Sequence, residues 1–119
     1  MNVGDLLAAT SLDLTEFQRL VNAFVDEFRG ADLSERQRMI SVGPEQSGKR
    51  EGLIAAVVSA LCREEAMSPP PWVRDIYSPE PFFALPARSF ALRVRLMLES
   101  PPPFRARNVF VPENYLSRA

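Results

Sequence analysis

The segment most suggestive of chemistry is Gly43-Pro44-Glu45-Gln46-Ser47-Gly48-Lys49-Arg50, which matches the pattern G-x-x-x-x-G-K. In phosphate-binding loops of this pattern, backbone amides at a helix start surround the phosphates, the Lys neutralises them, and the following Ser or Thr binds Mg²⁺. Here Arg50 replaces that hydroxyl residue, Glu45 adds a negative charge, and no βαβ units follow to form a sheet. We therefore interpret the segment as a turn between two helices. Phosphate or nucleotide binding through Gly48 and Lys49 is kept as an alternative hypothesis.

Few other residues offer catalytic chemistry. The 119-residue chain has no His and one Cys, which excludes an imidazole base, a His metal site and an intramolecular disulfide. The pairs Asp26-Glu27 and Glu64-Glu65 do not form two-carboxylate sites, because adjacent residues on a helix point about 100° apart. Cys62 falls within an apolar stretch, so we expect a buried, unreactive side chain. We predict that the protein is not an enzyme and binds no cofactor and no metal.

The charge balance argues against a general nucleic-acid binder. The chain has 14 Lys+Arg and 15 Asp+Glu, a net charge of −1, whereas nonspecific binding to nucleic acid needs a dense basic surface. Residues 1–66 carry 7 basic and 11 acidic side chains, and residues 67–119 carry 7 basic and 4 acidic ones. Residues 34–42 and the helix after residue 49 have a helix-turn-helix layout, but the apolar body of that second helix requires burial. We do not expect DNA binding. A DNA-binding regulator is kept as a further alternative, using Arg88, Arg93, Arg95, Arg105 and Arg107.

The start of the chain and its hydropathy bear on location. Residues 1–5 lack the basic region of a signal peptide, and no apolar run approaches the roughly 20 residues that cross a bilayer. Together with the single Cys, these features predict a cytoplasmic protein without a membrane partner.

Three helices are predicted before residue 67, after a short helical turn at residues 6–9. The best specified begins at Asp13, three residues before Glu16, and ends at Gly30, where we expect a left-handed cap. A short charged helix capped by Ser34 follows over residues 34–42, and an apolar central helix spans about residues 50–66. We expect the apolar stripe of the first helix to pack on the central helix. The residues are Phe17, Leu20, Phe24 and Phe28 against Leu53, Val57 and Leu61.

Proline marks a change in the character of the chain. Ten of the 11 prolines lie between residues 69 and 112. Six of them fall in residues 69–86 among aromatic and aliphatic side chains, which predicts an ordered, irregular strap over the helices. A last helix is expected from about Ala87 to Glu99, with an apolar face and basic residues elsewhere. Its apolar positions are Phe90, Leu92, Val94, Leu96, Met97 and Leu98.

Residues 104–119 form a tail too rich in apolar side chains to remain solvated. Either the tail folds back on the helices, or it adds to a partner as an extended segment. The three prolines at 101–103 stiffen the chain before the tail, which favours partner binding. The predicted fold is an all-α single domain of four to five helices. Its helical domain, including the proline-rich strap, spans residues 1–100, and an extended C-terminal tail spans residues 101–119.

Three segments of the chain resemble parts of known proteins. The segments concerned are Pro70–Tyr77, Ser100–Val111 and Leu116–Ala119. They resemble the ends of small uncharacterised bacterial proteins often encoded beside nucleotidyltransferase-like genes, in arrangements suggestive of toxin–antitoxin pairs. The resemblance covers less than half of the chain. It implies a non-enzymatic partner protein and assigns no functional residue.

Taken together, these observations predict a non-catalytic protein-interaction module. It is an antitoxin-like inhibitor in our hypothesis, and it offers its basic last helix and its tail to a protein encoded by a neighbouring gene. The sequence leaves the oligomeric state open. The predicted partner-binding residues are Arg88, Arg95, Phe104, Arg105, Arg107, Val109, Phe110, Tyr115 and Leu116.

Overall fold

The computed structural model describes residues 1–84 and 89–118 and confirms the all-α class. The described residues hold six α-helices rather than four to five, because two short segments, α1 and α6, are also helical. Two 3-10 turns and two short strands complete the fold. The elements are α1 (Val3–Ala8), α2 (Leu14–Gly30), α3 (Leu33–Ile40), α4 (Lys49–Glu64), η1 (Pro71–Arg74), β1 (Phe82–Phe83), α5 (Phe90–Glu99), α6 (Pro102–Arg105), β2 (Val109–Phe110) and η2 (Tyr115–Arg118).

Helix α2 begins where the sequence predicts but ends differently. The side chain of Asp13 accepts a hydrogen bond from the Glu16 amide at 2.9 Å, which confirms the N-terminal cap. The left-handed cap predicted for Gly30 is wrong: Gly30 is the last helical residue, and Ala31 continues in extended backbone. The guanidinium of Arg36 instead donates to two carbonyls in the last turn of the helix, those of Phe28 and Arg29, each at 2.8 Å. A side chain from α3 therefore satisfies this helix end.

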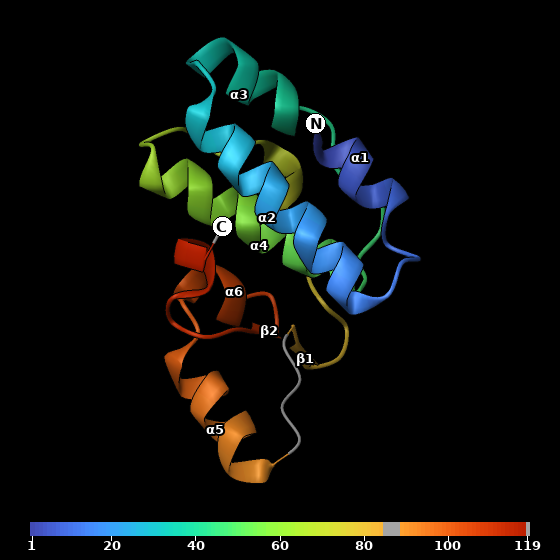
Figure 1. The fold of residues 1–119 in the computed structure, drawn as a ribbon, viewed down its shortest axis with the longest axis vertical. Helices are drawn as coiled ribbons and strands as arrows, with labels where there is room; N and C mark the ends of the chain where they lie inside the picture. The colour runs from blue at the N-terminus through green and yellow to red at the C-terminus, as the bar shows by residue number, and fades with distance from the viewer. Residues whose placement is uncertain (85–88, 119) are drawn as a thin grey trace.

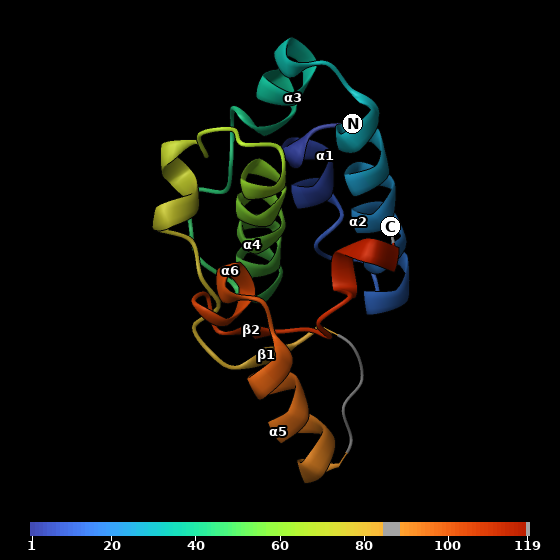
Figure 2. The same ribbon diagram turned by 90° about the vertical axis from the view of Figure 1, so that its left-hand side faces the viewer.

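Helix α4 forms the centre of the molecule. Its residues from Gly52 to Val58 are buried without interruption, as are Leu61 and Cys62. Helices α1 and α2 pack on one side of it and η1 on the other (Figures 1 and 2). Such all-round burial explains why its sequence is apolar on more than one face.

Helix α3 starts two residues earlier than predicted. Asp32, not Ser34, is the N-cap, and its carboxylate accepts from the Glu35 amide at 2.8 Å. Both Asp32 and Ser34 precede a Glu or Gln by three residues, and the aspartate takes the cap. The helix ends at Ile40, and the chain then runs through residues 41–48 without regular structure. The predicted turn between two helices is confirmed.

The proline-rich segment and the tail meet in a two-stranded parallel bridge. Strand β1 pairs with β2 in the register Phe82 with Val109 and Phe83 with Phe110. Hydrogen bonds from the amides of Ser78 to the Arg107 carbonyl (2.9 Å) and of Ala84 to the Phe110 carbonyl (3.2 Å) extend this contact. The bridge ties residues 78–84 to the C-terminal segment.

The tail is not an extended segment, which corrects the sequence prediction. The prolines at 102 and 103 begin the short helix α6, because proline fits the first turn of a helix. The chain after α6 returns through β2 and η2 to the body of helices (Figures 1 and 2). Phe104, Val109 and Val111 are fully buried, and Tyr115 nearly so, within the same core as α2 and α4.

Gly52 of α4 lies against the backbone of the proline-rich segment, and we expect Gly52→Ala to destabilise the fold. A Cβ at residue 52 would lie 2.7 Å from the Ser78 amide nitrogen and 2.8 Å from the Tyr77 carbonyl carbon. Displacing backbone should cost about 1–3 kcal/mol, more than the roughly 0.5–1 kcal/mol that alanine gains in a helix. Urea unfolding measures the difference. Gly30→Ala is the control: its Cβ meets nothing within 4 Å, so that variant should be as stable as the wild type or more so.

Candidate protein-binding surface

Helix α5 stands apart from the other helices. In both views it projects from the body formed by α1 to α4 (Figures 1 and 2). Its anchor is Leu96, which is buried with Phe110 and packs against Phe83 in a small cluster separate from the main core. The hydroxyl of Ser100 fixes the C-terminal end of the helix, donating to the Leu96 carbonyl at 2.6 Å and accepting from the Val111 amide at 2.8 Å. One side of α5 is thus firmly held.

The opposite side of α5 is apolar and exposed. At about 100° per residue, five residues fall within an arc of roughly 120° on the side away from Leu96. Phe90 is 83% exposed and Leu98 74%, whereas Met97 (42%) and Val94 (37%) are a little over a third exposed, and Ala91 is exposed. A surface helix normally turns its apolar side inward, so α5 has the reverse arrangement. We call this surface the outer face of α5. Its residues are Phe90, Ala91, Val94, Met97 and Leu98.

Charged side chains flank the outer face without entering it. The guanidinium of Arg93 lies over the Phe83 ring, 5.6 Å from its centre. Arg95 pairs with Glu99 one turn later at 2.8 Å, and this hydrogen bond raises the pKa of Arg95 above its ordinary value. Arg88, also predicted to bind a partner, lies outside the described residues.

An open groove of about 610 Å³ runs between α5 and the chain that follows β2. Its walls mix apolar residues with Arg95, Glu99 and Glu113. Because the arginine is already paired with Glu99, the groove offers no concentrated charge for a small ligand. Across the described chain, no group of three or more Cys, Asp or Glu side chains is placed to hold a metal ion.

Most of the tail residues predicted to bind a partner lie in the core instead. The rings of Phe104 and Tyr115 meet edge to face with centres 5.5 Å apart, and Val109 and Phe110 are buried. The hydroxyl of Tyr115 donates to Gln18 of α2, and burial raises the pKa of this phenol. Their burial within the fold corrects the expectation that a partner covers these apolar side chains. These four residues therefore form no exposed surface.

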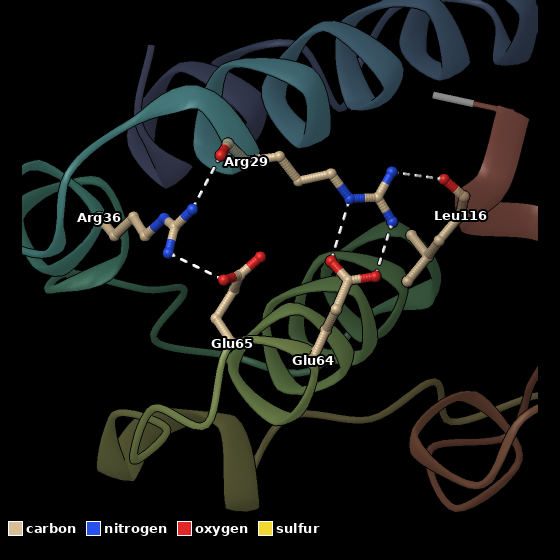
Figure 3. Close-up of polar contacts among 5 residues, drawn as sticks. All are labelled: Arg29, Arg36, Glu64, Glu65 and Leu116. Atoms are coloured by element: carbon tan, nitrogen blue, oxygen red, sulfur yellow. Dashed lines mark hydrogen bonds and ion pairs between the residues drawn. The ribbon is translucent and has the colours of Figure 1, made fainter.

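Leu116 is partly buried beside a group of hydrogen bonds and ion pairs that joins the tail to α2, α3 and the end of α4 (Figure 3). Arg29 binds Glu64 through two hydrogen bonds of 3.0 Å and donates to the Leu116 carbonyl at 2.9 Å. Arg36 binds Glu65 at 3.0 Å. The adjacent carboxylates Glu64 and Glu65 face different arginines, as expected if they do not form a two-carboxylate site. Through these arginines, the two glutamates hold α2 and α3 against the end of α4.

The two tail arginines differ in environment. Arg107 donates to the Val73 carbonyl at 3.1 and 2.9 Å and to the Pro103 carbonyl at 2.8 Å, and burial lowers its pKa. It is a cross-link within the fold rather than a surface contact. Arg105 is exposed. Because the protein itself engages Arg95 and Arg107, these two arginines add nothing to an open basic patch among the described residues of the second half.

The two basic side chains of the segment Gly43–Arg50 are held by contacts within the protein. Lys49 pairs with Glu80 at 3.4 Å, and the carboxylate of Glu51 lies so close to Gly48 that a Cβ there would be 2.4 Å from its oxygen. Arg50 donates to the Thr10 carbonyl at 2.8 Å and lies over the Phe17 ring. A carboxylate already occupies the helix start at which phosphate would bind.

Lys49→Ala should therefore change little. Its ammonium is exposed and pairs with an exposed glutamate, and such pairs contribute at most about 1 kcal/mol. We expect the wild type and the variant to bind no ATP or GTP in calorimetric titrations with Mg²⁺ present. Saturable nucleotide binding by the wild type that the variant loses would restore the phosphate-binding hypothesis.

Sequence reasoning missed the outer face of α5 as a surface. Its pattern alone shows apolar residues on two sides of one short helix, and either side is able to face the core.

Comparison with protein-family models, curated proteins and solved structures finds no match for this chain. None of the described helices is long and apolar enough to span a membrane.

Proposed function

We propose that this chain is a non-catalytic protein-binding module whose docking surface is the outer face of α5. The observation that carries the proposal is the exposure of Phe90 and Leu98 on a helix whose other side is anchored by Leu96. Contiguous exposed apolar surface on a soluble protein marks an interaction site. An apolar helix face also suits a groove or a second helix, with large side chains as anchors.

This proposal keeps the sequence hypothesis of an antitoxin-like inhibitor but moves its contact from the tail and the basic residues of the last helix to the apolar outer face of α5. The partner to test is the protein encoded by the neighbouring gene, and the cytoplasm is the compartment we propose.

The burial of Cys62 supports the proposal that the protein is not a catalyst. Burial raises the pKa of its thiol to about 11, so the nucleophilic thiolate is scarce at neutral pH.

Leu98→Glu tests the surface. We expect the wild-type chain to co-elute with the neighbouring gene product after coexpression, and the variant to lose at least tenfold in affinity, since a carboxylate would be buried in an apolar contact. Leu33→Glu is the matched control, because Leu33 is an exposed leucine (57%) on α3. It should bind like the wild type.

Calorimetry with the purified proteins gives the affinities. Folding is checked by circular dichroism, and both variants should melt as the wild type does because both leucines are exposed. A complex that survives Leu98→Glu but not Leu33→Glu would contradict the assignment of the surface to α5.

A further inference from the structure

We propose that Met97 is a site of reversible oxidation, and that its sulfoxide closes the outer face of α5 to the protein partner. The oxidant is hydrogen peroxide or another hydroperoxide. This inference rests on the proposed function, because it concerns the regulation of the surface proposed there. Three features support it: the exposure of Met97, its place within an apolar contact surface, and the burial of the thiol of Cys62.

The four methionines of the chain differ in their access to solvent. Met39 is 2% exposed in the main core, and Met67 is partly buried against the same core. Met97 is 42% exposed and Met1 36%. Because oxidation requires contact between sulfur and a dissolved oxidant, Met97 and Met1 should react before the other two. Of these two residues, Met97 belongs to the outer face of α5.

The thiol of the chain does not compete for the oxidant. Cys62 is fully buried in α4, and burial raises the pKa of its thiol to about 11. The thiolate, which is the form that reacts with peroxides, is therefore scarce at neutral pH and enclosed by the core. An oxidant thus acts on the docking surface through the thioether of Met97.

The reaction transfers one oxygen atom from the peroxide to sulfur. A lone pair of the Met97 sulfur attacks one peroxide oxygen, and the O–O bond breaks as the S–O bond forms. The second oxygen leaves as water, taking the proton of the first, so the sulfur is oxidised and the peroxide is reduced. Methionine sulfoxide reductases reverse the change: two thiols become a disulfide, and the oxygen leaves as water.

The sulfoxide puts a polar group into an apolar contact. Met97 lies beside Leu98 and one turn after Val94 on the outer face. The sulfoxide oxygen is a hydrogen-bond acceptor, and this face consists of apolar side chains. Burying the oxygen against the partner without a donor should weaken binding roughly tenfold. Because Met97 is exposed in the free chain, the same change should leave the fold intact.

Calorimetry with the oxidised chain tests the inference. The free chain is treated with hydrogen peroxide, the peroxide is removed, and peptide mass spectrometry locates the added oxygen. The oxidised wild type should bind the neighbouring gene product roughly tenfold more weakly than the untreated chain. Treatment with methionine sulfoxide reductases should restore the affinity. Both forms should melt alike when followed by circular dichroism.

Three variants separate the effect of Met97 from that of the other methionines. Met97→Leu keeps an apolar side chain of similar size, so it should bind like the wild type before and after peroxide. Met97→Gln places a polar amide on the outer face and should bind weakly without peroxide. Met1→Leu is the control, and it should lose affinity after peroxide as the wild type does. Leu, Gln and Met have similar helix propensities, so α5 should form in each variant.

The partner should in turn protect Met97 from oxidation. In the complex, the rate of oxidation at Met97 should fall several-fold, because the partner covers the outer face of α5. The rate at Met1 should not change, because the N-terminus lies at the other end of the molecule from α5 (Figure 1). Equal rates at Met97 in the free and the bound chain would contradict the inference.

The remaining outcomes overturn the inference in different ways. If the oxidised wild type keeps its affinity, Met97 does not regulate the surface and the proposed function still stands. A loss of affinity that Met97→Leu shares would assign the effect to another residue. A loss accompanied by a lower melting temperature would assign it to unfolding. If the untreated wild type does not bind the neighbouring gene product, the proposed function itself fails, and the inference fails with it.

Discussion

Deleting residues 104–119 should leave a chain that no longer unfolds cooperatively. The deletion removes Phe104, Val109, Val111 and Tyr115 from the main core. Burying an apolar side chain of this size contributes about 1.5–3 kcal/mol, so the four together account for roughly 6–12 kcal/mol. The total stability of a domain is about 5–15 kcal/mol. Thermal melting followed by circular dichroism, together with solubility, measures the effect.

Arg105→Ala provides the control within the same segment. Arg105 is exposed, so its removal should change the free energy of unfolding by less than about 0.5 kcal/mol. A truncated protein that keeps its helical signal and melts cooperatively would place the tail outside the core, as the sequence alone predicts.

The second large effect is expected for Phe24→Ala, at about 3–5 kcal/mol. Phe24 is fully buried, its ring centre is 6.2 Å from that of Phe28, and it belongs to the same core as Leu53 and Val57 of α4. Truncation leaves a cavity between the two longest helices. Urea unfolding at low protein concentration measures the loss.

Phe90→Ala is the matched control, since it removes the same side chain from a position that is 83% exposed. It should leave the unfolding midpoint of the monomer nearly unchanged. Equal losses in the two variants would mean that α5 packs inward and has no exposed outer face.

The local signals in the sequence predict α2 and α4 well. The apolar stripe at Phe17, Phe24 and Phe28 has helical spacing, Asp13 provides a cap, and the predicted packing of α2 on α4 is confirmed by their common core. These features are readable because they lie within a few residues of one another. The end of α2 could not be predicted in this way, because its capping group, Arg36, comes from another helix and no local spacing in the sequence indicates it.

The tail and α5 depend on contacts distant in sequence. Strand β2 pairs with β1 over only two residues on each side, too few for an alternating pattern to be visible. The apolar content of the tail shows that it must be covered, but not by what. In α5, Leu96 and Leu98 are equally apolar in sequence, and only the position of Phe110 and Phe83 decides that Leu96 turns inward. The candidate surface is therefore visible only in three dimensions.

Photo-cross-linking in cells tests the central claim most directly. Benzoylphenylalanine replaces Phe90 on the outer face of α5 or, as control, the exposed Leu33 on α3. The account predicts that irradiation joins the chain with residue 90 replaced to the neighbouring gene product, and that residue 33 gives no such product. Cross-linking at residue 33 but not at residue 90 would contradict the assignment of the docking surface to α5.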